Sequence, residues 1–321
     1  MQRWSDLAHT PEGLRPCVAT FGNFDGVHRG HRAVLARLVT EGAARGLPSV
    51  AVTFDPHPAT IFHPDTVELI APGELRDDQL ATTGIDGLLV LEFTREFAQQ
   101  SPEEFIVRTF VEALGAQALV VGEDARGFGR DYTGDVDTLR ELGRVHGFEV
   151  LVVEDLGDAD NPRFSSSAVR RHLDAGDVAA AAAILARPHR MTGTVVHGAH
   201  RGRELGYPTA NLSPDSLGLV PADGVYAGWL TRLGASPEDP ERTLPAAISV
   251  GTNPTFDGTA RTVEAYVLDR DDLELYDEQV GVEFVEHIRP TERFDSVEDL
   301  LEAMAGDVEK CRQVLASIVP S

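Results

Sequence analysis

The residue pattern changes near position 187, and this change restricts the fold more than any other feature. Before it, short apolar runs alternate with amphipathic, helix-like stretches; the runs are Cys17–Phe21, Ser49–Phe54, Leu88–Leu91, Ala118–Val121 and Val150–Val153. Strands that alternate with helices predict a parallel sheet covered on both faces, which binds ligands at the carboxyl ends of its strands. We therefore expect an α/β domain over residues 1–186.

After Met191 the apolar segments are short and are separated by Gly, Pro and Asn turns. The expected strands are Gly193–His197, Gly224–Leu230, Ala246–Val250, Thr262–Leu268 and Val280–Ile288. This pattern favours a small antiparallel barrel or sandwich over residues 187–321. A helix over 167–186 closes the first domain at Arg187-Pro188, and a terminal helix over 296–318 has Ser296 as its N-cap.

Charge and cysteine content exclude several classes of protein. The chain has 28 basic and 52 acidic residues, a net charge of −24, so we expect neither nucleic acid nor an anionic membrane surface as a partner. Its single lysine, Lys310, excludes lysine-dependent phosphate loops and Schiff-base chemistry in a core site. Two cysteines cannot form a disulfide framework. With no apolar leader and no long apolar run, we expect a cytoplasmic protein.

The segment VATFGNFDGVHRGH (18–31) places a buried strand, a glycine-rich turn and a helix start in succession. Glycines allow close backbone approach, and the first turn of a helix offers unpaired N–H groups, which together suit a phosphate. His28 and His31 are three residues apart, so they share one helix face about 5–6 Å apart and can donate to phosphate oxygens. The alternatives are core histidines or a metal pair; zinc is disfavoured because no third ligand is evident.

The segment resembles the HxGH signature of the nucleotidyltransferase superfamily. With TFDPHP (53–58), VVGEDARGFGRDYTG (120–134) and RFSSSAVRRHL (163–173), it is similar to the adenylyltransferase module of bacterial bifunctional riboflavin kinase/FAD synthetases. The resemblance implies a Rossmann-like domain that transfers AMP from ATP to the phosphate of FMN and releases pyrophosphate. One loop departs from the family: Ala125 replaces an aromatic residue, and Gly127 is an apparent insertion.

The same resemblance implies roles for particular residues. His28 and His31 would be catalytic. The residues expected at the ATP phosphates are Gly22, Asn23, Phe24, Asp25, Gly30, Arg163, Ser165, Ser166 and Arg170. Those expected at the flavin are His57, Asp124 and Phe128. The serines are also expected to cap a helix, and the alternative for Asp25 is that it fixes the turn.

A second motif lies in GTVVHGAHRGRELGYPTANL (193–212), which we interpret as a flap between strands. Its segment PTAN (208–211) presents Thr209 and Asn211, which are hard oxygen donors of the kind that suit Mg²⁺ bound to ATP phosphates. The alternative is that these four residues form an ordinary turn. With GRELGY before it and GVYAG (224–228) after it, the motif resembles the riboflavin kinase module. That resemblance implies Thr209 and Asn211 as Mg–ATP ligands, with Glu264 as the base. Without it, Glu264 is a polar position on a half-buried strand.

Taken together, the two resemblances imply a bifunctional enzyme that uses ATP and Mg²⁺. The barrel would phosphorylate riboflavin to FMN, and the α/β domain would convert FMN to FAD. The kinase family's DLYGK stretch appears here as ELYDEQ (274–279), with Asp277 in place of glycine. Two alternatives stay open: a monofunctional riboflavin kinase with a degenerate first half, and a non-catalytic flavin-binding regulator.

Overall fold

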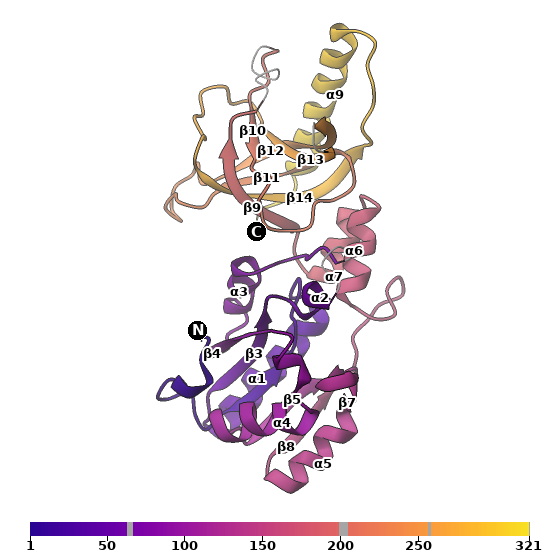
Figure 1. The fold of residues 1–321 in the computed structure, drawn as a ribbon. Coiled ribbons are helices and arrows are strands. Elements are labelled where there is room, and N and C mark those ends of the chain that lie inside the picture. The colour runs from indigo at the N-terminus through magenta and orange to yellow at the C-terminus, as the bar shows by residue number, and fades with distance from the viewer. Residues whose placement is uncertain (63–66, 199–204, 256–257, 321) are drawn as a thin grey trace. The chain divides into compact units, whose positions relative to one another are not determined.

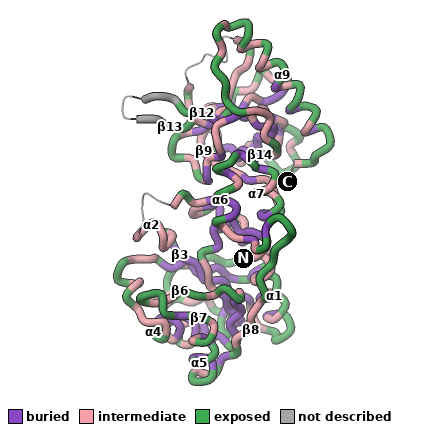
Figure 2. The backbone as a smooth tube through the Cα atoms, turned by 90° about the vertical axis from the view of Figure 1, so that its right-hand side faces the viewer, coloured by how far each residue is buried: buried purple, intermediate pink, exposed green. Residues whose placement is uncertain are grey.

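The structure is a computed structural model that describes residues 1–62, 67–198, 205–255 and 258–320. The chain forms two compact units, Met1–Ser166 and Ser167–Ser321, and each is described here by itself. Buried residues follow the strands of the sheet in the first unit and of the barrel in the second (Figure 2). Within the described parts of the chain, no helix is both long and apolar enough to cross a membrane.

The first unit is built on a six-stranded parallel sheet in the order β1-β4-β3-β2-β5-β8 (Figure 1). Its strands are β1 (Gln2–Trp4), β2 (Val18–Phe21), β3 (Ser49–Asp55), β4 (Gly87–Glu92), β5 (Ala118–Gly122) and β8 (Glu149–Val153). The α/β prediction is therefore confirmed. Strand β1 was not expected, because its three residues QRW contain no apolar run and pair only with β4 at the sheet edge.

Helices and short elements connect these strands. The helices are α1 (Arg29–Arg45), α2 (Pro58–Phe62), α3 (Glu74–Ala81), α4 (Pro102–Ile106), a π-helix (Val107–Ala113) and α5 (Val136–His146). Leu7–His9, Phe97–Gln99 and Arg130–Tyr132 form 3₁₀ turns, and β6 (Arg126–Phe128) pairs with β7 (Gly134–Asp135). Alternate residues of β3 serve different cores: Val50 and Val52 pack on one side of the sheet and Ala51 on the other. This two-sided burial explains the continuous apolar runs of the sequence.

The second unit contains two helices, a barrel and a terminal helix. The six antiparallel strands close in the order β10-β13-β12-β11-β14-β9. Their bounds are β9 (His189–Val196), β10 (Thr209–Leu212), β11 (Gly224–Arg232), β12 (Thr243–Thr255), β13 (Gly258–Val267) and β14 (Gln279–Arg289). Helix α9 (Val297–Leu315) packs on the outside of the barrel, and Ser296 caps it by accepting the N–H of Asp299. The predictions of a barrel, a terminal helix and its N-cap are confirmed.

The single helix expected over 167–186 is wrong. The structure has two helices, α6 (Ser166–Asp174) and α7 (Val178–Leu185), separated by a turn in which Gly176 has a φ of 76°. Glycine adopts this left-handed conformation without the steric cost of a side chain, and Asp177 then caps α7. Helix α7 packs on β9 and β14, so the compact units divide after Ser166, whereas the sequence predicts a boundary after residue 186.

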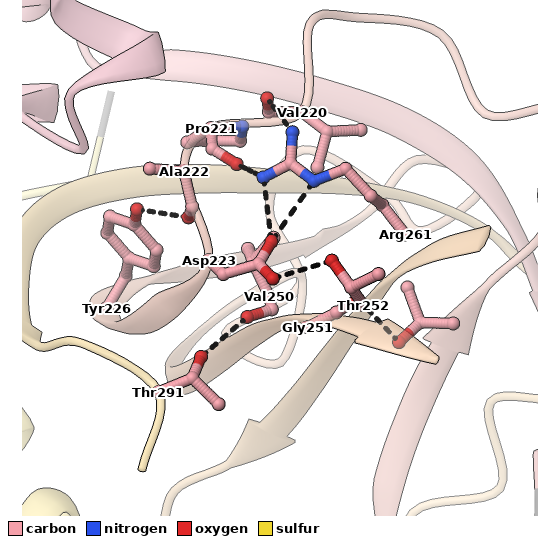
Figure 3. Close-up of polar contacts among 11 residues, drawn as sticks. Val220, Pro221, Ala222, Asp223, Tyr226, Val250, Gly251, Thr252, Arg261 and Thr291 are labelled. Carbon is pink, nitrogen blue, oxygen red and sulfur yellow. Dashed lines mark hydrogen bonds and ion pairs between the residues drawn. The ribbon is translucent and has the colours of Figure 1, made fainter. Parts of the chain in front are cut away.

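A polar cluster closes one end of the barrel (Figure 3). The guanidinium of Arg261 on β13 forms an ion pair with Asp223 at 3.1 Å and donates to the carbonyl oxygens of Val220 and Pro221. Thr252 on β12, directly opposite Arg261, donates to the other oxygen of Asp223 at 2.6 Å. The cluster thus ties the part of the β12–β13 hairpin near its turn to the segment that enters β11.

The packing of α7 predicts the size of the smallest stable fragment that contains the barrel. Val178, Ile184 and Leu185 are fully buried, and each such side chain contributes about 1.5–3 kcal/mol. The free energy of unfolding of a fragment of residues 167–321 should therefore exceed that of a fragment of residues 187–321 by roughly 3 kcal/mol or more. Urea unfolding of both fragments measures the difference. Equal free energies would show that α7 does not belong to the folding unit of the barrel.

Candidate active sites

The turn between β2 and α1 has an unusual backbone. Phe24, Gly26 and Val27 have φ angles of 51°, 79° and 41°, although such values are costly for Phe and Val. The side chains of Phe24 and Val27 are 2% and 0% exposed in the core beside α1, and this burial holds the turn. Phe24 was expected at the ATP phosphates, but its ring packs edge-on against His31, with centroids 5.3 Å apart. It therefore supports the histidine from the core.

The two histidines lie together at the start of α1. His28 is the N-cap, its Nδ1 accepts the N–H of His31 at 3.4 Å, and the two rings stack with centroids 3.7 Å apart. Burial, followed by the charges of His28 and Arg163, lowers the pKa of His31 well below its usual value. His31 is thus neutral at neutral pH, and its buried Nδ1 has no hydrogen-bond partner among the described residues. An unsatisfied imidazole nitrogen at a helix N-terminus suits a polar ligand.

Gly30 allows this arrangement. A Cβ on Gly30 would lie 3.1 Å from the ring of His28 and 3.3 Å from the carbonyl oxygen of Phe164. The segment before α6 therefore lies directly against the start of α1. The hydroxyl of Ser166 also reaches this turn and donates to the carbonyl oxygen of Asp25 at 2.8 Å.

Arg163 lies between two carboxylates that follow adjacent strands. Its guanidinium pairs with Asp155, after β8, at 3.0 Å and with Asp124, after β5. Burial and the nearby Glu123 raise the pKa of Asp155. The Arg163 side chain is 40% exposed, so an anionic group in solution can reach it. The structure thus brings Arg163 and Asp124 together, as the resemblance implied, at the carboxyl edge of the sheet.

The remaining expected residues of the first domain divide between the two compact units. His57 lies just before α2 and its Nδ1 accepts the N–H of Ala59 at 3.1 Å. Asn23 is exposed, and its carbonyl oxygen accepts from Thr53. Gly22 and Ser165 are half-buried in the β2–α1 turn and just before α6. Arg170 lies on α6, in the second compact unit.

An aromatic cluster lies at the same edge, and the sequence analysis named only one of its members, Phe128. Phe21 and Phe54 lie at the ends of β2 and β3, and Phe93 follows β4. Phe128 on β6 meets Phe21 with ring centroids 5.3 Å apart, and Phe54 meets Phe93 at 5.6 Å. Phe21, Phe93 and Phe128 are only partly buried. The signal was present in the sequence: a Phe recurs where each of three successive strands ends.

A compact polar site lies on the outer face of the barrel. Asn211 on β10 is directly opposite Glu264 on β13, and Thr209 lies two residues earlier on the same face. The Thr209 hydroxyl donates to Glu264 Oε2 at 3.1 Å, and Asn211 Nδ2 donates to Thr209 Oγ1 at 3.2 Å. All three expected residues therefore meet. The PTAN segment was interpreted as a turn or flap, but its last three residues belong to a strand.

Two further residues define the surroundings of this site. A Cβ on Gly198 would come within 2.6 Å of the Asn211 amide, so the backbone at Gly198 closes directly over Asn211. The ring of His197 lies against Tyr276, with centroids 4.0 Å apart. Next to it, Asp277 has a φ of 63° and donates its N–H to the Val195 carbonyl at 2.9 Å. This left-handed backbone is the conformation that the glycine of the family pattern favours. Gly202 of the expected flap lies outside the described residues.

The two units together define a class of enzyme: a nucleotidyltransferase with a histidine-capped helix, joined to a small β-barrel with a Thr–Asn–Glu site. The FAD synthetase family model matches residues 10–168, and the riboflavin kinase family model matches residues 185–315. The chain therefore belongs to the bifunctional riboflavin kinase/FMN adenylyltransferase family. Its activities are phosphorylation of riboflavin and adenylylation of FMN.

Curated relatives match almost the whole chain. A bifunctional riboflavin kinase/FMN adenylyltransferase of Pseudomonas fluorescens is 38% identical over 307 residues, covering 94% of each chain. The enzyme of the same name from Escherichia coli strain K12 is 36% identical over 98% of this chain and 97% of its own. A crystal structure from Streptococcus pneumoniae, described as a macrolide-efflux protein, superposes with a TM-score of 0.84 at 30% identity. It covers 97% of this chain and 98% of its own.

The close approach at Gly198 predicts a selective defect. Gly198→Ala would push the added methyl group into the Asn211 amide, so riboflavin phosphorylation should fall roughly 10- to 100-fold. Gly234→Ala, where a Cβ meets nothing within 4 Å, is the matched control and should retain full activity. Initial rates of FMN formation give the comparison. Equal rates for both variants would place Gly198 away from the working site.

Proposed function

We propose that the α/β unit transfers AMP to FMN at the carboxyl edge of its sheet, with His28 and His31 at the ATP phosphates. The phosphate of FMN is ionised at neutral pH, so attack on the α-phosphorus of ATP requires no general base. The protein then needs to align the groups and stabilise charge. A neutral His31 can donate a hydrogen bond from its unsatisfied nitrogen to a phosphate oxygen. Because the ring is uncharged, it does not repel the neighbouring Arg163.

Arg163 supplies the positive charge that the histidines lack. In the structure it is neutralised by Asp124 and Asp155, and its side chain is 40% exposed. A polyphosphate competes with these carboxylates for the guanidinium, since bidentate contact with phosphate is a strong charge-assisted interaction. Ser165 is proposed to add a hydroxyl donor and Ser166 its backbone N–H, because the Ser166 hydroxyl already donates to the carbonyl oxygen of Asp25. Gly22, Asn23 and Gly30 are proposed to offer backbone contacts to the same phosphates.

The flavin ring is proposed to bind at the aromatic cluster. Partly buried Phe21, Phe93 and Phe128 expose flat apolar surface at the carboxyl edge, where a heteroaromatic ring can stack. His57 and Asp124 are proposed to bind its polar atoms. Phe128 is held there by its own loop, because its ring packs over Gly134, where a Cβ would lie 2.5 Å away. The loop with Ala125 and Gly127 thus still presents an aromatic side chain, which favours the bifunctional reading over a degenerate first half.

In the barrel, Glu264 is proposed to remove the proton of the riboflavin hydroxyl that attacks ATP. A primary alcohol is a poor nucleophile until it loses its proton, so this half-reaction needs a base. The hydrogen bond from Thr209 fixes one carboxylate oxygen and leaves the other for substrate. The contact of Thr209 with both Glu264 and Asn211 is the single observation that most strongly supports catalysis over mere flavin binding.

Mg²⁺ is the proposed cofactor of both reactions. The oxygen atoms of Thr209, Asn211 and Glu264 are hard donors of the kind Mg²⁺ binds, and they lie within hydrogen-bond reach of one another. These residues therefore fit the ion, with Thr209 and Asn211 as its proposed ligands. When bound, the ion neutralises the charge of the ATP phosphates.

The domain assignment and location complete the proposal. Residues 1–186 would form adenylyltransferase and 187–321 kinase, and the family matches to 10–168 and 185–315 support this division. The substrates are small molecules, and a net charge of −24 disfavours nucleic acid as a partner. We propose that the enzyme acts in the cytoplasm.

One product assay tests whether the two sites are separate. The double variant His28→Ala/His31→Ala, incubated with riboflavin, ATP and Mg²⁺, should still form FMN but no FAD, because both histidines lie in the first compact unit. Chromatographic separation of the flavins reports both steps. Equal loss of FMN and FAD in a folded protein would contradict the assignment of two sites.

The role of Glu264 has its own test. Glu264→Gln keeps the shape of the side chain and removes its basicity, so FMN formation should fall by about 10²–10⁴-fold. Adenylylation of supplied FMN should be unchanged and serves as the internal control. Near-normal phosphorylation by the variant would remove Glu264 from the mechanism.

A further inference from the structure

Asp25 occupies the centre of the phosphate turn, yet its side chain points away from solvent. The residue is 3% exposed. Its two carboxylate oxygens accept backbone N–H groups from a distant segment: Oδ2 from Ile70 at 3.2 Å and Oδ1 from Ala71 at 2.9 Å. Such charge-assisted bonds to backbone N–H groups are about twice as strong as neutral ones. The carboxylate therefore holds the segment before α3 against the turn.

The same residue also holds the first residue of α6. Its backbone carbonyl accepts the hydroxyl of Ser166 at 2.8 Å. The neighbouring Gly26 lies so close to Ile70 that a Cβ would be 3.0 Å from its side chain. Asp25 is thus the point where three separate stretches of chain meet: the β2–α1 turn, residues 70–71 and Ser166.

We propose that Asp25 is a positioning residue for adenylyl transfer, which fixes the phosphate turn relative to Ser166 and makes no contact with ATP or its metal ion. A buried carboxylate with both oxygens engaged is poorly placed to receive either, and its negative charge would repel a phosphate. The turn needs such a brace because the left-handed backbone of Phe24 and Val27 is unfavourable for residues that carry a side chain. This inference rests on the proposed adenylyl-transfer site and revises the expected role of Asp25.

The test compares two isosteric variants of the full-length protein. Asp25→Asn keeps the shape of the side chain, but its single carbonyl oxygen can accept from only one of the two backbone N–H groups. Its NH₂ group then faces the remaining N–H group, which loses its acceptor. Asp86→Asn is the control: Asp86 accepts the N–H and the hydroxyl of Ser49, both at 2.8 Å, at the amino end of β3, away from the turn. Asp25→Asn should lower kcat/KM for FAD formation roughly 10- to 100-fold, and Asp86→Asn should leave it unchanged.

FMN formation, the Mg²⁺ requirement and the kinetics of FAD formation distinguish a positioning role of Asp25 from a role as a metal ligand. FMN formation by the Asp25→Asn protein should equal that of the wild type, and the Mg²⁺ concentration for half-maximal FAD formation should not change. A raised Mg²⁺ requirement would overturn the proposal, because it would make Asp25 a ligand of the metal. Normal FAD kinetics in Asp25→Asn would also overturn it, whereas a wild-type protein that forms no FAD would instead refute the proposed function.

A further measurement needs neither a variant nor catalysis. In the wild-type protein the amide hydrogens of Ile70 and Ala71 should exchange slowly with solvent, with the same protection before and after ATP is added, since Asp25 already holds them. Rapid exchange without ATP would overturn the proposal, because it would show that the carboxylate does not brace this segment in the free enzyme.

Discussion

The burial of Phe24 and Val27 is the interaction on which the first site depends. Both side chains lie in the core beside α1, and they hold a backbone that neither residue would adopt in an isolated peptide. Because the turn is fixed in this way, His28 ends as the N-cap of α1 and stacks on His31. The hydrophobic core thus sets the position of two polar rings, and the proposed phosphate site is built on a turn that the core holds in place.

The charge of the chain shapes the chemistry of both sites. A protein with a net charge of −24 and only one lysine must bind polyphosphates with few cationic side chains. In the α/β unit the proposed phosphate site offers helix-terminal N–H groups and a neutral imidazole, and Arg163 is paired with two carboxylates. Such neutral donors cost less to bury than charges do. In the barrel the described contacts of Glu264 include no cationic side chain, which is one reason that we propose a metal ion there.

The sequence predicted the architecture because its apolar pattern reflects burial on one or two faces. It could not predict β1, which is short, exposed and stabilised only by pairing with β4. It missed the break at Gly176, because glycine is tolerated in a helix and only packing against the barrel selects the left-handed turn. The PTAN segment was interpreted as part of a flap, because a strand of only four residues takes its register from β13 and β9. Contacts between distant parts of the chain therefore determine the secondary structure of these segments, which the local sequence pattern does not specify.

Motifs named the candidate residues, but only the fold separates those that can touch substrate from those that support them. Thr209, Asn211 and Glu264 are distant in sequence, and the antiparallel register of β10 and β13 places them on one face. In the first unit the single motif that holds His28 also holds Phe24 and Asp25, whose side chains point into the protein. A single motif therefore contains both residues that can contact a substrate and residues that only support the fold. Burial and hydrogen bonding distinguish the two, since a side chain whose polar atoms are already satisfied inside the protein has little left to offer a ligand.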